Sequence, residues 1–359
     1  MPRAKYIGVI EDLKTKIASG KLAPGDRIAS IREMCDAYDV SSIVALRVFR
    51  ELSDQGLIEK RDGEGYYVLP EDGDNHADKI ICAFRPLRDM SLTDNFGNRI
   101  IFGIMESALS NHKHVVFPES CMRLRNRIPT DEDVKLLADE VFSIPGIAGI
   151  VLDMRIPDES IRRHILPRAG RIPVVVAGRS AKAPVKASFF PMEEIGADVA
   201  KLARRSSAAV FLLFPASEAT FSDIRLLEHA FLKTLDADPA AVFTTREFTT
   251  VSREKDREVA EIAAKHIAAA RGKAFVFCGA DSMAGYFYDL MKEHGLTAPQ
   301  DYILMGFGGF ELSEIHTPKL ATVALDQAAI GRNAVELALG GSMENSIAAP
   351  YAVKFNETF

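Results

Sequence analysis

Residues 28–68 read IASIREMCDAYDVSSIVALRVFRELSDQGLIEKRDGEGYYV and carry the clearest signals for the fold of the first part of the chain. Ser30 and Glu33 form the reciprocal capping pair that begins a helix, and Ser41 or Ser42 caps the next helix after a tight turn. Two short strand-like runs with a glycine-containing turn between them follow, and an amphipathic helix precedes the stretch. This order of elements predicts a winged helix-turn-helix.

The last helix of this stretch is the predicted recognition helix. One of its faces is apolar, and the opposite face carries Ser42, Ile43, Leu46, Arg47 and Arg50, free to enter a DNA major groove. A solvated helix face would carry the same residue types, so each side chain taken alone also has a structural explanation. Taken together with the hairpin, the pattern predicts DNA binding.

The hairpin turn and two arginines complete the predicted DNA surface. Glycines let the turn approach phosphates or a minor groove, and the arginines of the second helix and of the wing base are expected to hold phosphates. The glycines could equally serve only the turn, and the serines only the helix ends. The predicted DNA-binding residues are Ser30, Arg32, Ser41, Ser42, Ile43, Leu46, Arg47, Arg50, Arg61, Gly63 and Gly65.

Four motifs make this segment resemble the GntR family of bacterial transcription regulators. Within residues 5–69 they are Ser30-Ile31-Arg32-Glu33, Val40-Ser41, Gly56-Leu57-Ile58 and Gly63-Glu64-Gly65. The sequence departs from the family at Ser42, Ile43 and Leu46, where many members carry Arg, Thr and Arg. The resemblance implies binding to double-stranded operator DNA, and these departures leave the operator sequence open.

The composition is that of a globular protein with two or three domains. The 359 residues are 47% hydrophobic and 26% charged, which excludes a disordered or fibrous chain. The net charge of −6 comes from the residues after position 70, because residues 1–70 hold equal numbers of basic and acidic groups. A DNA-binding surface therefore needs a local cluster of basic side chains in the first segment.

The sequence also predicts a cytoplasmic protein without metal. The first residues are charged where a secretory signal needs an apolar run, and the longest apolar stretch, at 208–214, is far too short to span a membrane. The cysteines at positions 35, 82, 121 and 278 are too far apart for paired metal ligands. We expect them to be buried thiols.

A polar segment, PEDGDNHADK at 70–79, separates the first part of the chain from the rest. We interpret residues 1–70 as a DNA-binding domain, 71–78 as a linker and 79–359 as a second domain. In this domain apolar strand runs alternate with amphipathic helices. Strands are predicted at 79–84, 115–118, 147–152, 172–178, 209–214, 240–245, 273–278, 301–307 and 320–325. The alternation predicts an α/β fold with two lobes, each a doubly wound parallel sheet.

Four stretches resemble the ligand-sensing domain of LacI/GalR regulators, which is similar to periplasmic sugar-binding proteins. They are NRIIFGIMESAL (98–109), IPVVVAGRS (172–180), FVFCGADSMAGYFYDLMKEHGL (275–296) and APQDYILMGFGGFELSEIHTPKLATVALDQAAIG (298–331). The family usually has Asn, Asp and Asp-Asn where this sequence has Ala280, Gly308 and Pro191-Met192. The resemblance implies a periplasmic-binding-protein-like fold, a sugar in the cleft between the lobes, and a homodimer held by the lobes.

In such a fold the ligand lies at the carboxyl ends of the strands. Arg179 and Asp281 match positions that the resemblance assigns to sugar hydroxyls, which a guanidinium and a carboxylate bind in pairs. Alternatively, Asp281 only caps its helix, Arg179 only anchors a hinge, and Phe96 belongs to the core. The glycines within 306–309 are predicted to form a hinge where the chain crosses between lobes. The predicted effector-binding residues are Arg88, Phe96, Glu119, Asp153, Arg179, Asp281 and Asp326.

An enzyme is the competing class, and the sequence holds little that favours it. It has no HExxH, GxxxxGKS/T or GxSxG motif, and GFGGFE at 306–311 has Glu311 where a dinucleotide loop needs its third glycine. We therefore expect a transcriptional repressor without a cofactor, relieved by a small carbohydrate. Activation, and a solute-binding or enzymatic protein that uses the same cleft, stay open as alternatives.

Overall fold

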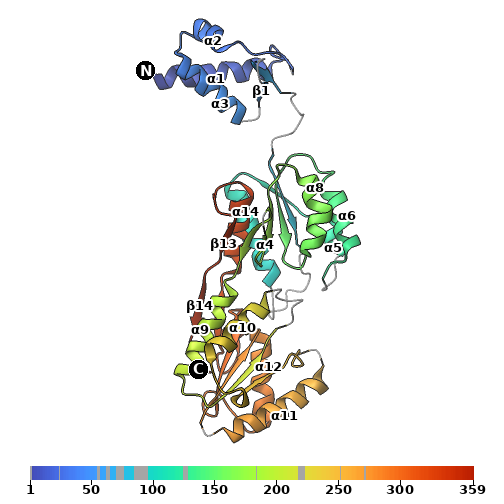
Figure 1. The fold of residues 1–359 in the computed structure, drawn as a ribbon, viewed down its shortest axis with the longest axis vertical. Coiled ribbons are helices and arrows are strands. Elements are labelled where there is room, and N and C mark those ends of the chain that lie inside the picture. Colours follow the sequence, from blue (N-terminus) through green and yellow to red (C-terminus); the bar gives the residue numbers. More distant parts are fainter. Residues whose placement is uncertain are drawn as a thin grey trace. The chain divides into compact units, whose positions relative to one another are not determined.

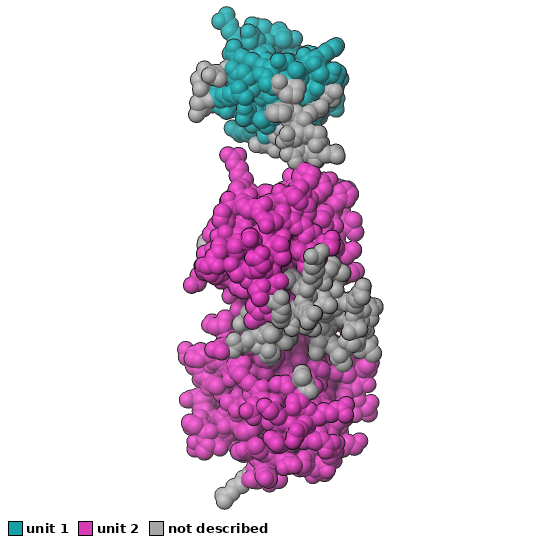
Figure 2. Space-filling model, turned by 90° about the vertical axis from the view of Figure 1, so that its right-hand side faces the viewer, with its two compact units in different colours: residues 1–76 teal, residues 77–359 magenta. Residues whose placement is uncertain are grey.

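The computed structural model describes residues 2–23, 25–54, 57–61, 65–69, 77–84, 96–123, 128–182, 184–216, 223–250, 252–270 and 272–359. The chain divides into two compact units, residues 1–76 and 77–359, which Figure 2 colours separately. The buried hydrophobic clusters of the described residues lie within one unit or the other. No helix in these ranges is long and apolar enough to cross a membrane.

The first unit is a winged helix-turn-helix, as predicted. Ser30 Oγ accepts a hydrogen bond from the Glu33 amide at 3.3 Å, and the Glu33 carboxylate accepts one from the Ser30 amide at 2.6 Å, so the predicted capping pair begins α2. Tyr66 of the hairpin stacks on Phe49 with ring centroids 4.4 Å apart, which fixes the wing against α3. The elements are α1 (Pro2–Ala18), α2 (Ile31–Tyr38), α3 (Ser42–Asp54) and the antiparallel pair β1 (Ile58–Arg61) and β2 (Gly65–Val68).

The first lobe of the second unit is a six-stranded parallel sheet between two layers of helices (Figure 1). Successive strand residues alternate between the faces: Ile80 and Cys82 pack with α4 and α14, and Ile81 and Ala83 with α6 and α8. The strand order is β13 (Ser346–Ala348), β7 (Lys186–Phe189), β6 (Val174–Ala177), β5 (Ile147–Asp153), β3 (Lys79–Ala83) and β4 (His114–Val116). The helices are α4 (Phe96–Ser110), α5 (Glu119–Arg123), α6 (Asp131–Val141), α7 (Asp158–Ser160), a π-helical turn (Ile161–Ile165), α8 (Leu166–Ala169) and α14 (Gln327–Ala338).

The second lobe is also a six-stranded sheet, parallel except for its edge strand β14. One face packs against α9 and α10 and the other against α11 and α12. The strand order is β14 (Tyr351–Lys354), β12 (Ala321–Leu325), β11 (Tyr302–Gly308), β10 (Ala274–Cys278), β8 (Val210–Phe214) and β9 (Val242–Thr244). The helices are α9 (Met192–Arg205), α10 (Ile224–Leu235), a 3₁₀ turn (Pro239–Ala241), α11 (Arg253–Ala269), α12 (Asp281–Glu293) and α13 (Glu311–Ile315). The predicted α/β fold with two lobes is therefore confirmed.

The predicted hinge is wrong. Gly308 ends β11, which pairs in parallel with β12 in the same sheet, so the chain stays in the second lobe there. Within the described residues it passes between the lobes after β7, between β12 and α14 at Asp326, and between β13 and β14. Gly308 and Gly309 instead have φ of 121° and 69°, which let the chain turn tightly from β11 into α13.

The three cysteines of the second unit are buried thiols, as predicted, whereas Cys35 of the first unit is only partly buried, so the prediction is wrong for that residue. Cys82 and Cys278 lie inside the core, and burial raises the pKa of each well above its ordinary value. Burial also raises the pKa of Cys121 to about 12. These thiols are therefore protonated near neutral pH and are poor nucleophiles and metal ligands.

Candidate functional site

The outer face of α3 carries the side chains that were expected to read DNA. Ile43 is 77% exposed and Leu46 is 47% exposed, and Ser42, Arg47 and Arg50 are exposed on the same helix. The opposite face, Ala45, Val48, Phe49 and Leu52, is completely buried. This packing fixes which side of α3 can face a partner, and DNA contact by these residues stays a prediction.

Arg47 is held on the surface of α3 by an aromatic side chain of α1. Its guanidinium lies over the Tyr6 ring, 4.7 Å from the centroid, and Tyr6 Oη donates a hydrogen bond to Glu51 at 3.2 Å. A cation over an aromatic face is attracted to it and loses part of its conformational freedom. The arginine is thereby partly pre-ordered on the exposed face of the helix.

The other predicted DNA residues lie around the turn and the wing. Arg61 lies over the Tyr67 ring at 4.4 Å and pairs with Glu59 at 2.8 Å, while Arg32 is exposed on α2. Ser41 Oγ accepts a bond from the Val44 amide at 3.4 Å, and Ser30 caps α2 as described. Gly65 has a φ of 110°, and Gly63 lies outside the described residues.

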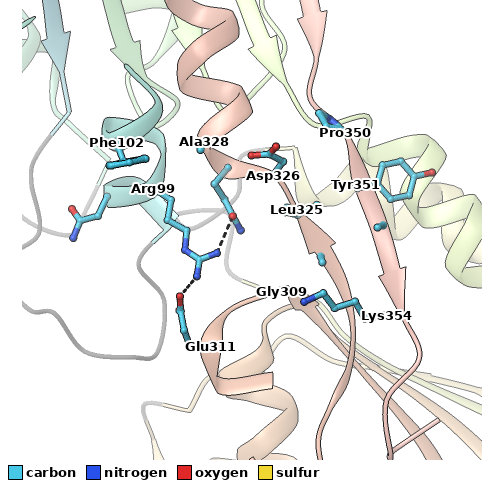
Figure 3. A pocket seen from close by; sticks show the side chains of 14 residues that line it. Arg99, Phe102, Gly309, Glu311, Leu325, Asp326, Ala328, Pro350, Tyr351 and Lys354 are labelled. Carbon is cyan, nitrogen blue, oxygen red and sulfur yellow. Dashed lines mark hydrogen bonds and ion pairs between the residues drawn. The ribbon is translucent and has the colours of Figure 1, made fainter. Parts of the chain in front are cut away.

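A pocket of about 760 Å³ opens where the two lobes of the second unit meet (Figure 3). Its volume is in the range of small-molecule sites. The first lobe contributes the start of α4 and of α14, and the second lobe contributes β12, β14 and the loop before α13. The lining residues are Asn98, Arg99, Phe102, Gly309, Glu311, Ala324, Leu325, Asp326, Gln327, Ala328, Pro350, Tyr351, Ala352 and Lys354.

Arg99 links the two lobes across this pocket. It forms an ion pair with Glu311 of α13, and its Nη1 donates to Gln327 Oε1 at 3.5 Å (Figure 3). The guanidinium also lies 5.4 Å from the centre of the Phe310 ring. Gln327 Nε2 in turn donates to the Gly308 carbonyl at 2.7 Å. These contacts depend on the relative position of the lobes, so a ligand that changes them would be coupled to lobe movement.

The second cation of the pocket, Lys354, lies on the edge strand β14. Its Nζ donates to Glu314 Oε1 of α13 at 3.0 Å, and this contact lowers the pKa of the Glu314 carboxyl. Asp326 lies between the lobes, where it caps α14 by accepting from the Ala329 amide at 2.8 Å and pairs with Arg332 at 3.1 Å. Asp326 is the predicted effector residue that lines the described pocket.

Arg179 is buried and makes its contacts within the first lobe. Its Nε and Nη2 donate to the Met154 and Ile156 carbonyls at 2.8 and 2.9 Å, its Nη1 donates to Ser180, and Nη2 also contacts Asp158 at 2.5 Å. These bonds tie the end of β6 to the segment after β5 within the first lobe, so they lie at none of the crossings between the lobes and do not match the hinge-anchor alternative. Ligand contact by Arg179 stays a prediction.

Asp281 is also buried, and both of its carboxylate oxygens have donors from the protein. Oδ2 accepts from the Phe310 amide at 2.8 Å, and Oδ1 accepts from Thr322 Oγ1 at 2.6 Å. The side chain therefore joins the start of α12 to the starts of α13 and β12. These contacts describe a residue that organises the second lobe, and its role toward a ligand stays a prediction.

The other predicted effector residues in the described part of the chain are not among the residues that line the pocket. Asp153 is buried and pairs with Arg155 through both oxygens, at 2.9 and 2.6 Å, and Glu119 is exposed at the start of α5. Phe96 is buried against Phe190 with ring centroids 5.7 Å apart, as in its core alternative. Arg88 lies outside the described residues.

Arg99 and Lys354 were missed by the sequence reasoning. Arg99 sits in the first turn of the helix after the first strand of the sheet, so the rule that selects strand ends could have found it. Lys354 gave no such signal, because β14 was not predicted and a lysine in a short edge strand ordinarily serves to discourage strand pairing.

Family models match both units. The model "Bacterial regulatory proteins, gntR family" matches residues 5–68, and the model "Periplasmic binding protein-like domain" matches residues 199–354. The ribose operon repressor of Haemophilus influenzae is 38% identical over 64 residues, which are 18% of this chain and 19% of that protein. The chain spans a quarter or less of the length of the curated relatives that it matches first.

Solved structures with the same fold cover most of the chain. A LacI-family regulator from Enterococcus faecium with bound ribose has a TM-score of 0.59 at 16% identity, over 78% of this chain and 97% of that one. The lac repressor dimer bound to operator and an anti-inducer has a TM-score of 0.60 at 17% identity, over 78% and 93%. The first unit thus matches the gntR family model, and the second unit matches the periplasmic-binding-protein-like model over residues 199–354 and has the fold of these solved regulator structures.

Proposed function

We propose that this protein is a DNA-binding transcriptional regulator, a repressor whose operator binding is controlled by a small carbohydrate-like effector. The observation that carries the proposal is the outer face of α3, which exposes Arg47 and Arg50 beside apolar side chains on a domain that the GntR model matches. The pocket between the lobes supplies a place for the effector in the same chain. The ribose-bound and operator-bound structures of similar fold support both roles.

The effector acts through the lobes in this proposal. The pocket is lined from both lobes, so a bound ligand adds contacts that favour one arrangement of the lobes over another. The ligand can change operator affinity only as far as the ligand itself binds one arrangement of the lobes more tightly than the other. In allosteric proteins this change in affinity is about 5- to 150-fold. Catalysis has no part in the proposal, and the regulator would work in the cytoplasm, where its operator is.

We further propose a homodimer that uses the outer face of α4. Phe102, Met105 and Leu109 are 63%, 42% and 66% exposed, and their spacing places them on one side of the helix. An exposed apolar row of this kind is typical of a protein contact. A twofold dimer would also present two recognition helices to successive major grooves, about 34 Å apart.

Arg47→Ala is expected to weaken operator binding by about 1–3 kcal/mol, because an arginine in the major groove binds a base edge with two hydrogen bonds. The measurement is a titration of labelled DNA from upstream of the gene, at two salt concentrations. Arg204→Ala, which removes the same charge from an exposed position of α9, is the control. Unchanged operator affinity in Arg47→Ala would remove this arginine from the proposed reading surface.

A fragment that begins at Ala77 is expected to fold, to dimerise and to retain effector binding, but to lose DNA binding. Its hydrophobic clusters include no residue of the first unit, so its core does not need that unit. Circular dichroism, sedimentation and a gel shift test these three properties. An unfolded fragment, or a monomer where the full chain is dimeric, would contradict the division or the proposed dimer contact.

A further inference from the structure

Two cations line the pocket where the lobes meet, the junction pocket, and both are paired with glutamates of one helix. Arg99 comes from the first lobe and Lys354 from the second, and each is neutralised by a glutamate of the short helix α13, Glu311 or Glu314. The side chains of these glutamates are 53% and 42% exposed. Both cations that line the pocket therefore have counter-ions that reach them from a solvent-exposed helix.

Such ion pairs are readily exchanged. Exposed pairs between charged side chains contribute little to stability, because water solvates each partner well when they separate. An anion that enters the pocket can replace Glu311 on the Arg99 guanidinium, whose planar group of donors matches a carboxylate or a phosphate. A second contact from Lys354 would add a cation from the opposite lobe.

The residues expected to hold a neutral sugar are occupied. Both oxygens of Asp281 and several donors of Arg179 already bond to the protein, and Ala280 and Gly308 carry no polar side chain. The pocket offers amide groups at Asn98 and Gln327 for hydroxyls. Its cations are Arg99 and Lys354, and its carboxylate other than Glu311, that of Asp326, already accepts from Arg332 and the Ala329 amide.

We propose that the junction pocket binds a small hydroxylated anion, a sugar acid or a sugar phosphate, with its charged group between Arg99 and Lys354 in place of Glu311. This inference rests on the proposed function and specifies its effector class. The ligand would exchange the Arg99–Glu311 contact between the lobes for a contact of its own. The charged group of the effector would thereby change a contact that holds the two lobes in position.

The direct test is calorimetry on the full chain with four probes: ribose, ribonate, ribose 5-phosphate and inorganic phosphate. We expect at least one anion to bind about tenfold or more tightly than ribose, a difference that corresponds to one charged contact. Ribonate against ribose 5-phosphate distinguishes a carboxylate from a phosphate ligand. Failure of all three anions to bind at about 10 mM, or ribose binding as tightly as they do, would overturn the proposal.

Two substitutions give opposite expected effects. Lys354→Gln removes a cation and should weaken anion binding about tenfold, whereas Glu311→Gln removes the competing carboxylate and should strengthen it. A merely structural ion pair would not make a ligand bind more tightly when it is broken. Lys319→Gln, next to the same Glu314 at 3.7 Å but outside the pocket lining, and the exposed Glu132→Gln are the controls.

The outcomes separate this inference from the proposed function. Operator binding that responds to ribose but to none of the anions would overturn the anionic effector and leave the regulator intact. Suppose that Lys354→Gln weakens and Glu311→Gln strengthens anion binding, but the chain binds no operator. That result would support the anion site and contradict the proposed regulator. Anion affinities unchanged by Lys354→Gln and Glu311→Gln would place the ligand elsewhere and overturn the inference.

Discussion

Gly331→Ala is expected to destabilise the second unit by about 3 kcal/mol or more, at the upper end for an overpacked core position. Helices α4 and α14 approach so closely that a Cβ on Gly331 would lie 2.1 Å from the Ile100 carbonyl oxygen and 2.5 Å from the Ile104 amide. Gly103 of α4 lies equally close to α14, since a Cβ there would be 2.0 Å from the Ala328 carbonyl oxygen. The obstructing atoms are backbone, which cannot rotate away.

The effect would also reach the pocket, because Arg99 and Gln327 lie on these two helices. Gly97→Ala is the matched control: this glycine is in the first turn of the same α4, and a Cβ there meets nothing within 4 Å. Alanine at Gly97 should be neutral or slightly stabilising, since alanine favours helix. Denaturant unfolding of both variants is the measurement, and equal stabilities would contradict the close packing of the helices.

Asp281→Ala is expected to lower the free energy of unfolding by about 2–4 kcal/mol, because it leaves two buried donors without an acceptor. The Phe310 amide and the Thr322 hydroxyl both bond to this carboxylate, at 2.8 and 2.6 Å. Asp281→Asn keeps one acceptor oxygen and should cost less. The second lobe would loosen where β11 meets α13.

This expectation differs from the sequence-based one, in which Asp281 contacts the effector. Thermal unfolding without ligand separates the two roles, since a structural residue lowers the melting temperature of the empty protein. A variant with unchanged stability that no longer responds to its effector would restore Asp281 as a ligand contact. Loss of stability with an unchanged ligand affinity, measured well below the melting temperature, would remove it from the binding site.

The first unit could be predicted closely because its signals are local. Ser30 and Glu33 cap one helix within three residues of each other, and the apolar spacing of α3 decides which of its faces is buried. The second unit needed long-range pairing. The strands β7, β13 and β14 are three or four residues long and were not predicted. Near the end of the chain, β13 joins the sheet of the first lobe and β14 the sheet of the second, so neither lobe is continuous in sequence.

Of the predicted effector residues that the structure describes, Asp326 is the one that lines the pocket between the lobes. The strand-end rule selected Asp281 and Arg179 as ligand contacts, and both are buried polar residues outside the pocket lining. A sequence does not show which groups will occupy their hydrogen bonds. The partners of Asp281 come from 29 and 41 residues away. For the same reason the Arg99–Glu311 pair, whose members are 212 residues apart, could emerge only from the folded structure.

In the proposed function, one chain both binds specific DNA and changes its affinity for that DNA when a small molecule binds. The most direct measurement is the fluorescence anisotropy of labelled upstream DNA titrated with the full chain, alone and with saturating ribose, ribonate or ribose 5-phosphate. We expect saturable binding that resists competing non-specific DNA, and a shift in its dissociation constant of about fivefold or more with one of these ligands. Binding no tighter than to unrelated DNA, or specific binding that none of these ligands changes, would contradict it.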